Sequence, residues 1–161
     1  MSSIYRLTPK SYSNLRRLLA IQTKPLGKIL QEADLISSFQ LETALSNQIL
    51  YPNLKIGEIL AKDGSIAQKT ADFFVRDWSK VITESEKNAI GYYLERAAIL
   101  DREQIEIILD EQKSSGVRFG TIAVLQGYIK STTLDFFLAN LFPEEIHKSP
   151  FVNMYSTTGL S

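Results

Sequence analysis

The sequence contains no cysteine and only one histidine among its 161 residues. A chain without cysteine forms no disulfide, has no thiol nucleophile and offers no zinc-finger ligands. The single histidine, His147, stands beside Lys148 with no other metal ligand at a metal-binding spacing. The sequence also lacks a phosphate-binding loop, a nucleophile elbow and a zinc signature. We therefore expect a protein that is not an enzyme, has no catalytic residues and needs no metal or cofactor.

The sequence also has no long apolar segment, and its formal net charge is zero. No apolar stretch approaches the roughly 18 residues that a membrane-spanning helix needs, and the first ten residues lack the apolar segment of a secretory signal. We therefore expect no membrane span and a cytoplasmic location. Eighteen basic residues balance eighteen acidic ones, which argues against duplex nucleic acid as a partner. The hydrophobic share of 44% is that of a soluble globular protein.

What the sequence does have is an internal repeat. Four copies of one pattern cover residues 25–48, 55–78, 89–112 and 118–141. A fixed recurrence of this size indicates stacked supersecondary units, here a helix, a turn and a second helix in each copy. Every copy has glycine at its third position, and these glycines are Gly27, Gly57, Gly91 and Gly120.

The pattern also predicts where the helices begin and end. We expect a first helix of about three turns, with a left-handed exit at repeat position 10, where two copies have glycine. Capping boxes at Ser37–Gln40 and Asp101–Gln104 then predict the start of a second helix in the first and third copies. That helix should bury repeat positions 17, 20, 21 and 24. In the third copy these positions are Ile105, Ile108, Leu109 and Gln112.

Differences between the copies alternate, so the larger unit is a pair. The second and fourth copies share a Thr-x-Asp-Phe-Phe segment that the other two lack. We therefore predict an all-α fold of four stacked helix–turn–helix repeats in two pairs, residues 25–78 and 89–141. A connector at 79–88, where Thr83 and Glu86 are placed to cap an early helix start, joins them. A C-terminal tail at 142–161 follows the second pair.

Residues 1–24 are predicted to form a basic arm and a capping helix. All six basic residues before Glu32 lie between Arg6 and Lys28. Tyr12, Leu15, Leu18 and Leu19 fall on one face at helical spacing, which would cover the open end of the first repeat. The basic arm either meets an anionic lipid, a phosphate ligand or an acidic partner, or lies solvated against the acidic body of the chain.

Two aromatic residues at the same repeat position have two interpretations. Phe73 and Phe136 stand at position 19, which points away from the expected buried stripe. The two pairs either pack on each other through these rings, or the rings bind a protein partner or a second copy of the chain.

The start of each repeat has the chemistry of an anion site. Free backbone N–H groups at a helix start attract phosphate, and glycine allows close approach. Lys55 and Arg118 open the second and fourth copies, and arginine pairs with phosphate through two hydrogen bonds. Alternatively, the glycine only lets two helices cross closely, and the basic residue is solvated.

These features resemble the MshEN domain, the N-terminal domain of type II secretion and type IV pilus assembly ATPases. The resemblance covers residues 25–141, and we expect no ATPase domain with it. It implies binding of cyclic di-GMP through a leading arginine, a glycine and a closing glutamine in each motif. Where that pattern expects arginine or glutamine, this chain has Pro25, Trp78, Ala89 and Leu141. The matching residues are Arg118, Gly120, Gln112 and Gly91 in the second pair, and Lys55, Gly57, Gln48 and Gly27 in the first.

The sequence thus supports two hypotheses. The first is a non-catalytic regulatory module that senses a cyclic di-GMP-type dinucleotide and passes its state to a protein partner. The second is an interaction adaptor that keeps the fold but has lost nucleotide binding. In the adaptor, Phe73, Phe136 and the basic arm are the binding surface, and a homo-oligomer is one form it takes.

Overall fold

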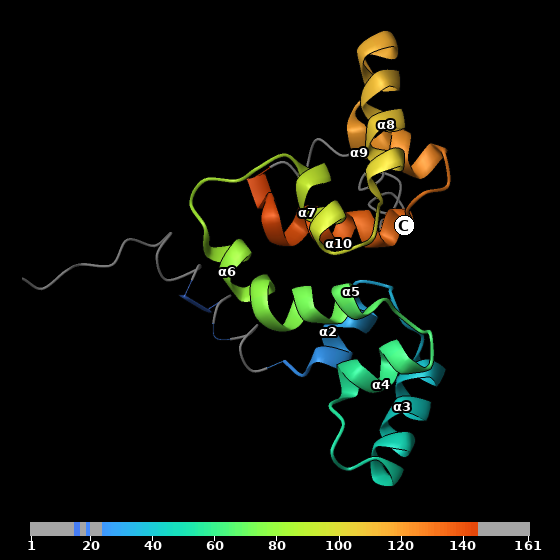
Figure 1. Cartoon of the computed structure of the whole chain (residues 1–161). Coiled ribbons are helices and arrows are strands. Elements are labelled where there is room, and N and C mark those ends of the chain that lie inside the picture. Colours follow the sequence, from blue (N-terminus) through green and yellow to red (C-terminus); the bar gives the residue numbers. More distant parts are fainter. Residues whose placement is uncertain (1–14, 17–18, 20–23, 145–161) are drawn as a thin grey trace, which may run out of the picture.

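The computed structural model describes residues 15–16, 19 and 24–144 (Figure 1). These residues form helices and connecting turns without a strand, which confirms the all-α prediction. No helix in this part of the chain is both long and apolar enough to cross a membrane. In chain order the elements are α2 (Leu26–Glu32), α3 (Ser38–Leu50), α4 (Ile56–Lys62), α5 (Gln68–Asp72), η1 (Phe73–Asp77), α6 (Trp78–Thr83), α7 (Ile90–Arg96), α8 (Arg102–Ser115), α9 (Phe119–Leu125) and α10 (Ser131–Leu141).

Each copy of the repeated sequence begins with a helix of seven residues. This is about two turns, so the predicted length of three turns is wrong. The predicted exit at repeat position 10 is confirmed, because the backbone there is left-handed in every copy. The φ angles are 55° at Asp34, 81° at Gly64, 54° at Ala98 and 74° at Gly127. The chain therefore leaves the helix in the same way even where the residue is not glycine.

The second helices begin where the capping boxes predict. The side chain of Ser37 accepts from the Gln40 backbone N–H at 3.1 Å, and that of Asp101 accepts from the Gln104 N–H at 2.8 Å. The predicted cap at Thr83 is wrong. Thr83 is the last residue of α6, and its hydroxyl donates to the carbonyl of Ser79. The connector between the pairs therefore begins after this helix.

The second copy differs from the others in its second helix. There a π-helical segment, η1, stands between α5 and α6. The extra residue in a π-turn rotates the helix face that follows it, so a simple 3.6-residue wheel misplaces the side chains beyond it.

Two equivalent hydrogen bonds join the pairs. The hydroxyl of Thr70 donates to the carbonyl of Ala97, and that of Thr133 donates to the carbonyl of Ala33, both at 2.7 Å. The second copy thus contacts the third in the way that the fourth contacts the first. In Figure 1, α5, α6 and α10 accordingly lie in the middle of the molecule, while α3 and α8 point away at opposite ends.

Aromatic rings fill the space between the pairs. Phe73 stacks on Phe137 with ring centroids 6.5 Å apart, and Trp78 stacks on Phe136 at 5.2 Å. Phe73 is 2% exposed, and Phe136 is half-buried. The pairs therefore pack on each other through these rings, and the prediction that Phe73 and Phe136 form an external partner surface is wrong.

The buried stripe of the second helices also differs from the expected one. Position 21 is exposed in three copies, at Leu45, Val75 and Leu109, whereas Thr70 and Thr133 at position 16 are buried. Position 16 faces the other repeat pair. The hydrophobic pattern within one copy does not reveal this contact, because the contact is made between two pairs.

The predicted N-terminal capping helix lies mostly outside the described residues. Leu15, Arg16 and Leu19 are helical, and Leu15 and Leu19 are 45% and 55% exposed. These two side chains therefore do not belong to a buried capping face. At the other end, Phe142 contacts Tyr93 with ring centroids 6.2 Å apart, so the first residue of the predicted tail belongs to the folded body.

Candidate functional site

Two pockets occupy equivalent places in the second and third copies. We name them the α4 pocket and the α7 pocket, after the short helix whose first residues line each one. The α4 pocket has a volume of about 410 Å³ and is lined by Leu26, Lys55, Ile56, Gly57, Glu58, Gln68, Ala71, Asp72, Val75 and Arg76. The α7 pocket has a volume of about 300 Å³ and is lined by Ala89, Ile90, Gly91, Tyr92, Glu95, Arg102, Ile105, Leu109, Gln112 and Phe119.

The residue at position 17 differs between these two copies and the other two. In the first and fourth copies it is leucine, and its side chain lies over the glycine of the same copy. A Cβ added to Gly27 would lie 2.5 Å from Leu41, and one added to Gly120 would lie 2.9 Å from Leu134. In the second and third copies the residues are Ala71 and Ile105, and both line a pocket. The side chain at position 17 thus borders a pocket in these two copies.

The glycines have a packing role in all four copies. In the second and third copies the close neighbour comes from the paired repeat. A Cβ on Gly57 would lie 2.9 Å from Leu26, and one on Gly91 would lie 2.9 Å from the ring of Phe119. Close helix crossing is therefore one reason for each glycine. Their role in admitting a ligand stays a prediction.

The α7 pocket brings together part of the predicted site. Gly91 and Gln112 line it, and Gln112 is half-buried at the far end of α8. Phe119, which is 9% exposed, comes from the start of α9 and forms another wall. Arg118 directly precedes this ring, caps the start of α9 and is exposed. Gly120 lies apart from the pocket, under Leu134.

The charged side chains around the α7 pocket form exposed ion pairs with one another. The guanidinium of Arg102 lies 3.4 Å from carboxylate oxygens of both Glu95 and Glu106, and its side chain is 69% exposed. Exposed ion pairs of this kind contribute little to stability, so the arginine is available to exchange partners. The floor of the pocket is apolar. Its residues are Ile90, Ile105 and Leu109.

The α4 pocket is less suited to an anion. Lys55 and Arg76 line it, but so do two acidic residues, Glu58 and Asp72. A carboxylate oxygen of Glu58 accepts the backbone N–H of Lys55 at 2.7 Å. A negative charge thus already occupies the start of α4, where a phosphate would otherwise be attracted.

The remaining predicted residues of the first pair are not assembled around this pocket. The amide of Gln48 donates to the backbone carbonyl of Leu54 at 3.4 Å, and Gly27 is covered by Leu41. Trp78 is 2% exposed and packs on Phe136, so its ring face is not free to stack on a base.

Five residues of the α7 pocket were not predicted from the sequence: Ile90, Tyr92, Glu95, Arg102 and Phe119. Phe119 was recognisable from the sequence as an exception, because the other copies have leucine or isoleucine at repeat position 2. Tyr92 and Arg102 were not recognisable, since each stands at an ordinary exposed helix position.

Comparison with known proteins yields one relative of undefined function. No protein-family model matches the chain, and no solved structure matches it. The chain is 43% identical over 121 residues to an uncharacterized protein of Picosynechococcus sp. strain PCC 7002. The match covers 75% of this chain and 66% of that protein, just under two thirds of its length.

Proposed function

We propose that this chain is a non-catalytic regulatory module that binds a cyclic di-GMP-type dinucleotide in its second repeat pair and passes its occupancy to a protein partner. The observation that carries the proposal is the α7 pocket. It gathers Gly91, Gln112 and Phe119 from three helices into one partly apolar space. Pockets of this size, with apolar walls and a few polar groups, are the usual sites of small ligands.

The side chains around the pocket match the parts of a guanine nucleotide. The ring of Phe119 offers a face on which a base stacks. The Gln112 amide both donates and accepts, as a guanine edge requires. Arg118 directly precedes Phe119 in the chain, and its guanidinium would pair with a phosphate through two hydrogen bonds. Phe119 lies against Gly91 in this structure, so a bound base stacks on the outer face of the ring or moves it.

Contacts at the other end of α7 provide a route to the first pair. Arg96, the last residue of α7, forms an ion pair with Asp77 of η1 at 2.9 Å. The next residue, Ala97, accepts the hydroxyl hydrogen bond of Thr70. A shift of α7 on ligand binding therefore acts on η1 and α5 directly, and a partner that contacts the first pair would sense it.

Calorimetry with cyclic di-GMP tests the proposal. We expect saturable heat with the unchanged protein and a large loss of affinity in Arg118→Ala and Gln112→Ala. Removal of a hydrogen bond to a charged group costs about 1.5–3 kcal/mol. Lys55→Ala is the matched control, because Lys55 opens the second copy as Arg118 opens the fourth, and it should bind nearly as the unchanged protein does. Absence of heat at hundreds of micromolar ligand would contradict the sensor function.

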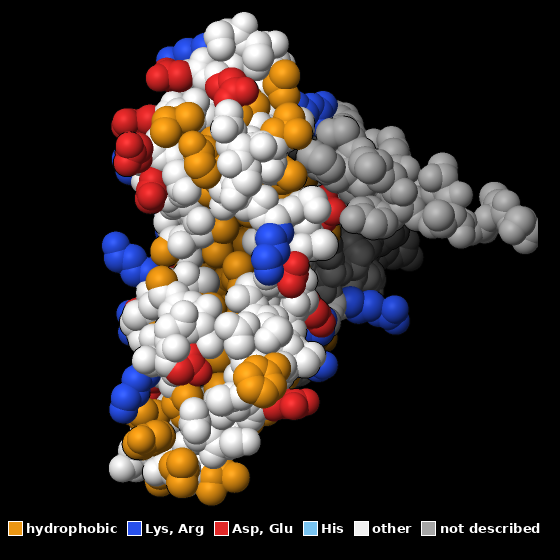
Figure 2. Space-filling view, turned by 90° about the vertical axis from the view of Figure 1, so that its right-hand side faces the viewer, with side chains coloured by type: hydrophobic (Ala, Val, Ile, Leu, Met, Phe, Trp, Pro, Cys, Tyr) orange, Lys and Arg blue, Asp and Glu red, His pale blue; other side chains and the backbone are white. Residues whose placement is uncertain are grey.

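A second candidate function, a protein-interaction adaptor, is favoured by the exposed end of α3. Ile49 and Leu50 are 82% and 72% exposed, and Leu45 and Tyr51 are also exposed. Hydrophobic side chains gather at the corresponding lower end of the molecule in Figure 2. The equivalent end of α8 is polar, with the sequence Lys-Ser-Ser at residues 113–115. The repeat itself therefore does not require the apolar residues of α3.

Paired substitutions separate the adaptor from the sensor. Ile49→Ser with Leu50→Ser should abolish binding of a protein partner and leave cyclic di-GMP binding unchanged. Leu125→Ser is the control, because Leu125 is 75% exposed on α9, away from this end. Equal partner binding by the α3 variant and the control would rule out this surface.

A further inference from the structure

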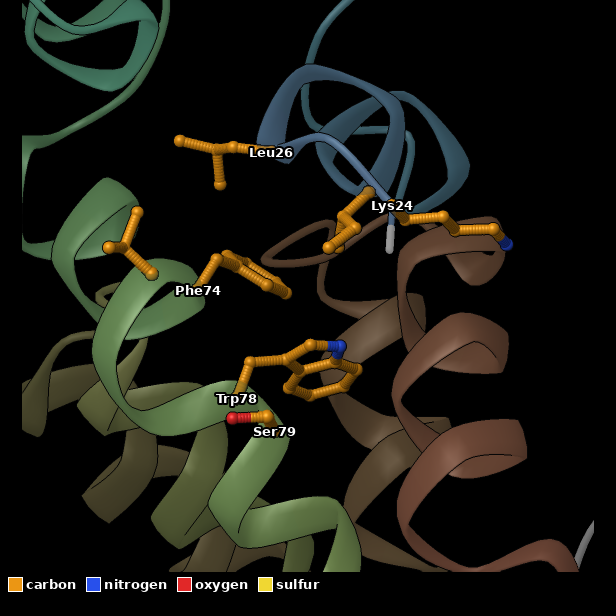
Figure 3. Close-up of a pocket in the computed structure, with 7 residues that line it drawn as sticks. Lys24, Leu26, Phe74, Trp78 and Ser79 are labelled. Carbon is orange, nitrogen blue, oxygen red and sulfur yellow. The ribbon is translucent and has the colours of Figure 1, made fainter. Parts of the chain in front are cut away.

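A third pocket, of about 310 Å³, lies between α2 and the η1–α6 segment (Figure 3). We name it the α2–α6 pocket. It is separate from the α7 pocket and shares no residue with it. Four of its lining residues are apolar in addition to Trp78, and they come from both sides of the space. These are Leu26 and Ile29 from α2, and Phe74 and Val75 from η1.

A hydrogen-bond donor on a largely buried side chain faces this pocket. Trp78 is 2% exposed, yet its indole N–H donates to no other residue in the described part of the chain. Figure 3 shows the nitrogen edge of the indole turned toward the side of the pocket where Lys24 stands. The nitrogen is not among the fully enclosed atoms that lack a partner, so a molecule in the pocket can reach it. The indole N–H therefore offers one hydrogen-bond donor to the pocket.

The pocket wall is built from an unusual helix. Phe74 and Val75 belong to η1, the π-helical segment that, among the described helices, occurs only in the second copy. Segments of π-helix occur frequently at functional sites, because the widened turn displaces side chains from the regular pattern. Here it places Phe74 and Trp78 on the same pocket, with ring centroids 5.0 Å apart.

Among the described residues that line the pocket, Lys24 is the charged one, and its charge is positive. Its ammonium lies 2.8 Å from a carboxylate oxygen of Glu32, and both side chains are 44% exposed. An ion pair that is this exposed exchanges partners at little cost. A carboxylate at the pocket mouth therefore has an accessible counterion.

We propose that the α2–α6 pocket binds a medium-chain aliphatic carboxylate. The alkyl chain lies among Leu26, Ile29 and Phe74, one carboxylate oxygen accepts the Trp78 N–H, and Lys24 balances the charge. The volume is about twice that of an engineered apolar cavity of about 150 Å³ that holds benzene. A chain of roughly eight carbons therefore fits.

Trp78 is the only tryptophan in the sequence, so it reports directly on its own pocket. Titration with octanoate should move the single indole N–H signal in ¹H–¹⁵N spectra downfield and in a saturable way. Octanol, with the same chain and no charge, should bind at least several-fold more weakly, and octylamine should produce no saturable shift. Equal shifts with octylamine and octanoate would overturn the carboxylate assignment. No saturable shift with millimolar octanoate would overturn the site.

Two variants locate the binding. Val75→Phe enlarges an exposed wall residue and should block the pocket, whereas Leu125→Phe enlarges a comparably exposed residue elsewhere and should bind octanoate normally. Lys24→Gln should lose the preference for octanoate over octanol. Unchanged octanoate binding in both Val75→Phe and Lys24→Gln would place the ligand elsewhere and overturn the proposal. These outcomes are independent of cyclic di-GMP binding at the α7 pocket.

Discussion

The hydroxyl of Thr133 donates to the backbone carbonyl of Ala33 at 2.7 Å, across 100 residues of sequence. Thr70 makes the equivalent bond to Ala97, also at 2.7 Å. Both donors stand at repeat position 16 and both acceptors at position 9, so the two pairs meet through an approximate two-fold relationship. Thr70 and Thr133 are the buried polar side chains of the described core.

These bonds should contribute measurably to stability. Thr133→Val keeps the shape of the side chain and removes the donor, which leaves the carbonyl of Ala33 without this bond. We expect the free energy of unfolding to fall by about 1–3 kcal/mol, and by a similar amount in Thr70→Val. Urea denaturation measures both changes. Thr83→Val is the control at an exposed threonine, and an equal loss there would contradict the role of the buried bonds.

Ala98 adopts a backbone conformation that glycine would adopt with less strain. Its φ angle is 54°, and its side chain is exposed. Ala98→Gly should therefore raise the free energy of unfolding, by about 1 kcal/mol. The neighbour Ala97 has φ −77° and is fully buried, so Ala97→Gly should lower stability instead. Thermal unfolding of the two variants compares the same substitution at adjacent positions. A shift in the same direction in both would contradict the strain at Ala98.

Phe73 provides a test of the aromatic contact between the pairs. Its side chain is 2% exposed and packs against rings of both pairs. Phe73→Ala should cost about 3–5 kcal/mol, as large-to-small changes in a core do. Phe39→Ala is the matched control, because Phe39 is 76% exposed and its loss should change stability by less than about 0.5 kcal/mol. Equal melting temperatures of the Phe73→Ala and Phe39→Ala variants would contradict the burial of Phe73.

Asp135 should make stability depend on pH. Burial raises the pKa of its carboxyl group, and its Oδ1 oxygen is buried without a hydrogen-bond partner. The pKa of Asp135 is therefore higher in the folded than in the unfolded chain. As pH rises from the unfolded pKa through the folded pKa, ionisation of Asp135 lowers the free energy of unfolding. Asp135→Asn should therefore be more stable than the unchanged protein at pH 7. The difference should narrow as pH falls through the folded pKa.

The equivalent residue of the second copy is the control for this pH effect. Asp72 stands at the same repeat position, and its Oδ1 accepts from the Gln68 amide at 3.0 Å. Asp72→Asn should bring no gain at neutral pH, because this carboxylate already has a partner. Urea unfolding at several pH values compares the two variants, and a gain in Asp72→Asn as large as that in Asp135→Asn would contradict the argument.

The candidate site was predictable only in part. Gly91 and Gln112 were expected together, and both line the α7 pocket. Phe119 and Arg102 also line it, but their roles depend on how α7, α8 and α9 pack. The repeat pattern did not predict the α2–α6 pocket. In that pattern Trp78 is only a residue that replaces the expected glutamine. Its neighbours Ile29 and Phe74 lie 45 residues apart and meet only in the folded chain.

The sequence by itself determined the local structure of this protein. Four short helices, their left-handed exits at repeat position 10 and the capping boxes at Ser37 and Asp101 follow from interactions within a few residues. The tertiary structure decided how the pairs meet, and thereby the burial of Phe73 and the exposure of Leu109. The physical reason is that a helix has two faces able to bury apolar surface. Which face is covered depends on a partner far away in the sequence, as Thr133 and Ala33 show.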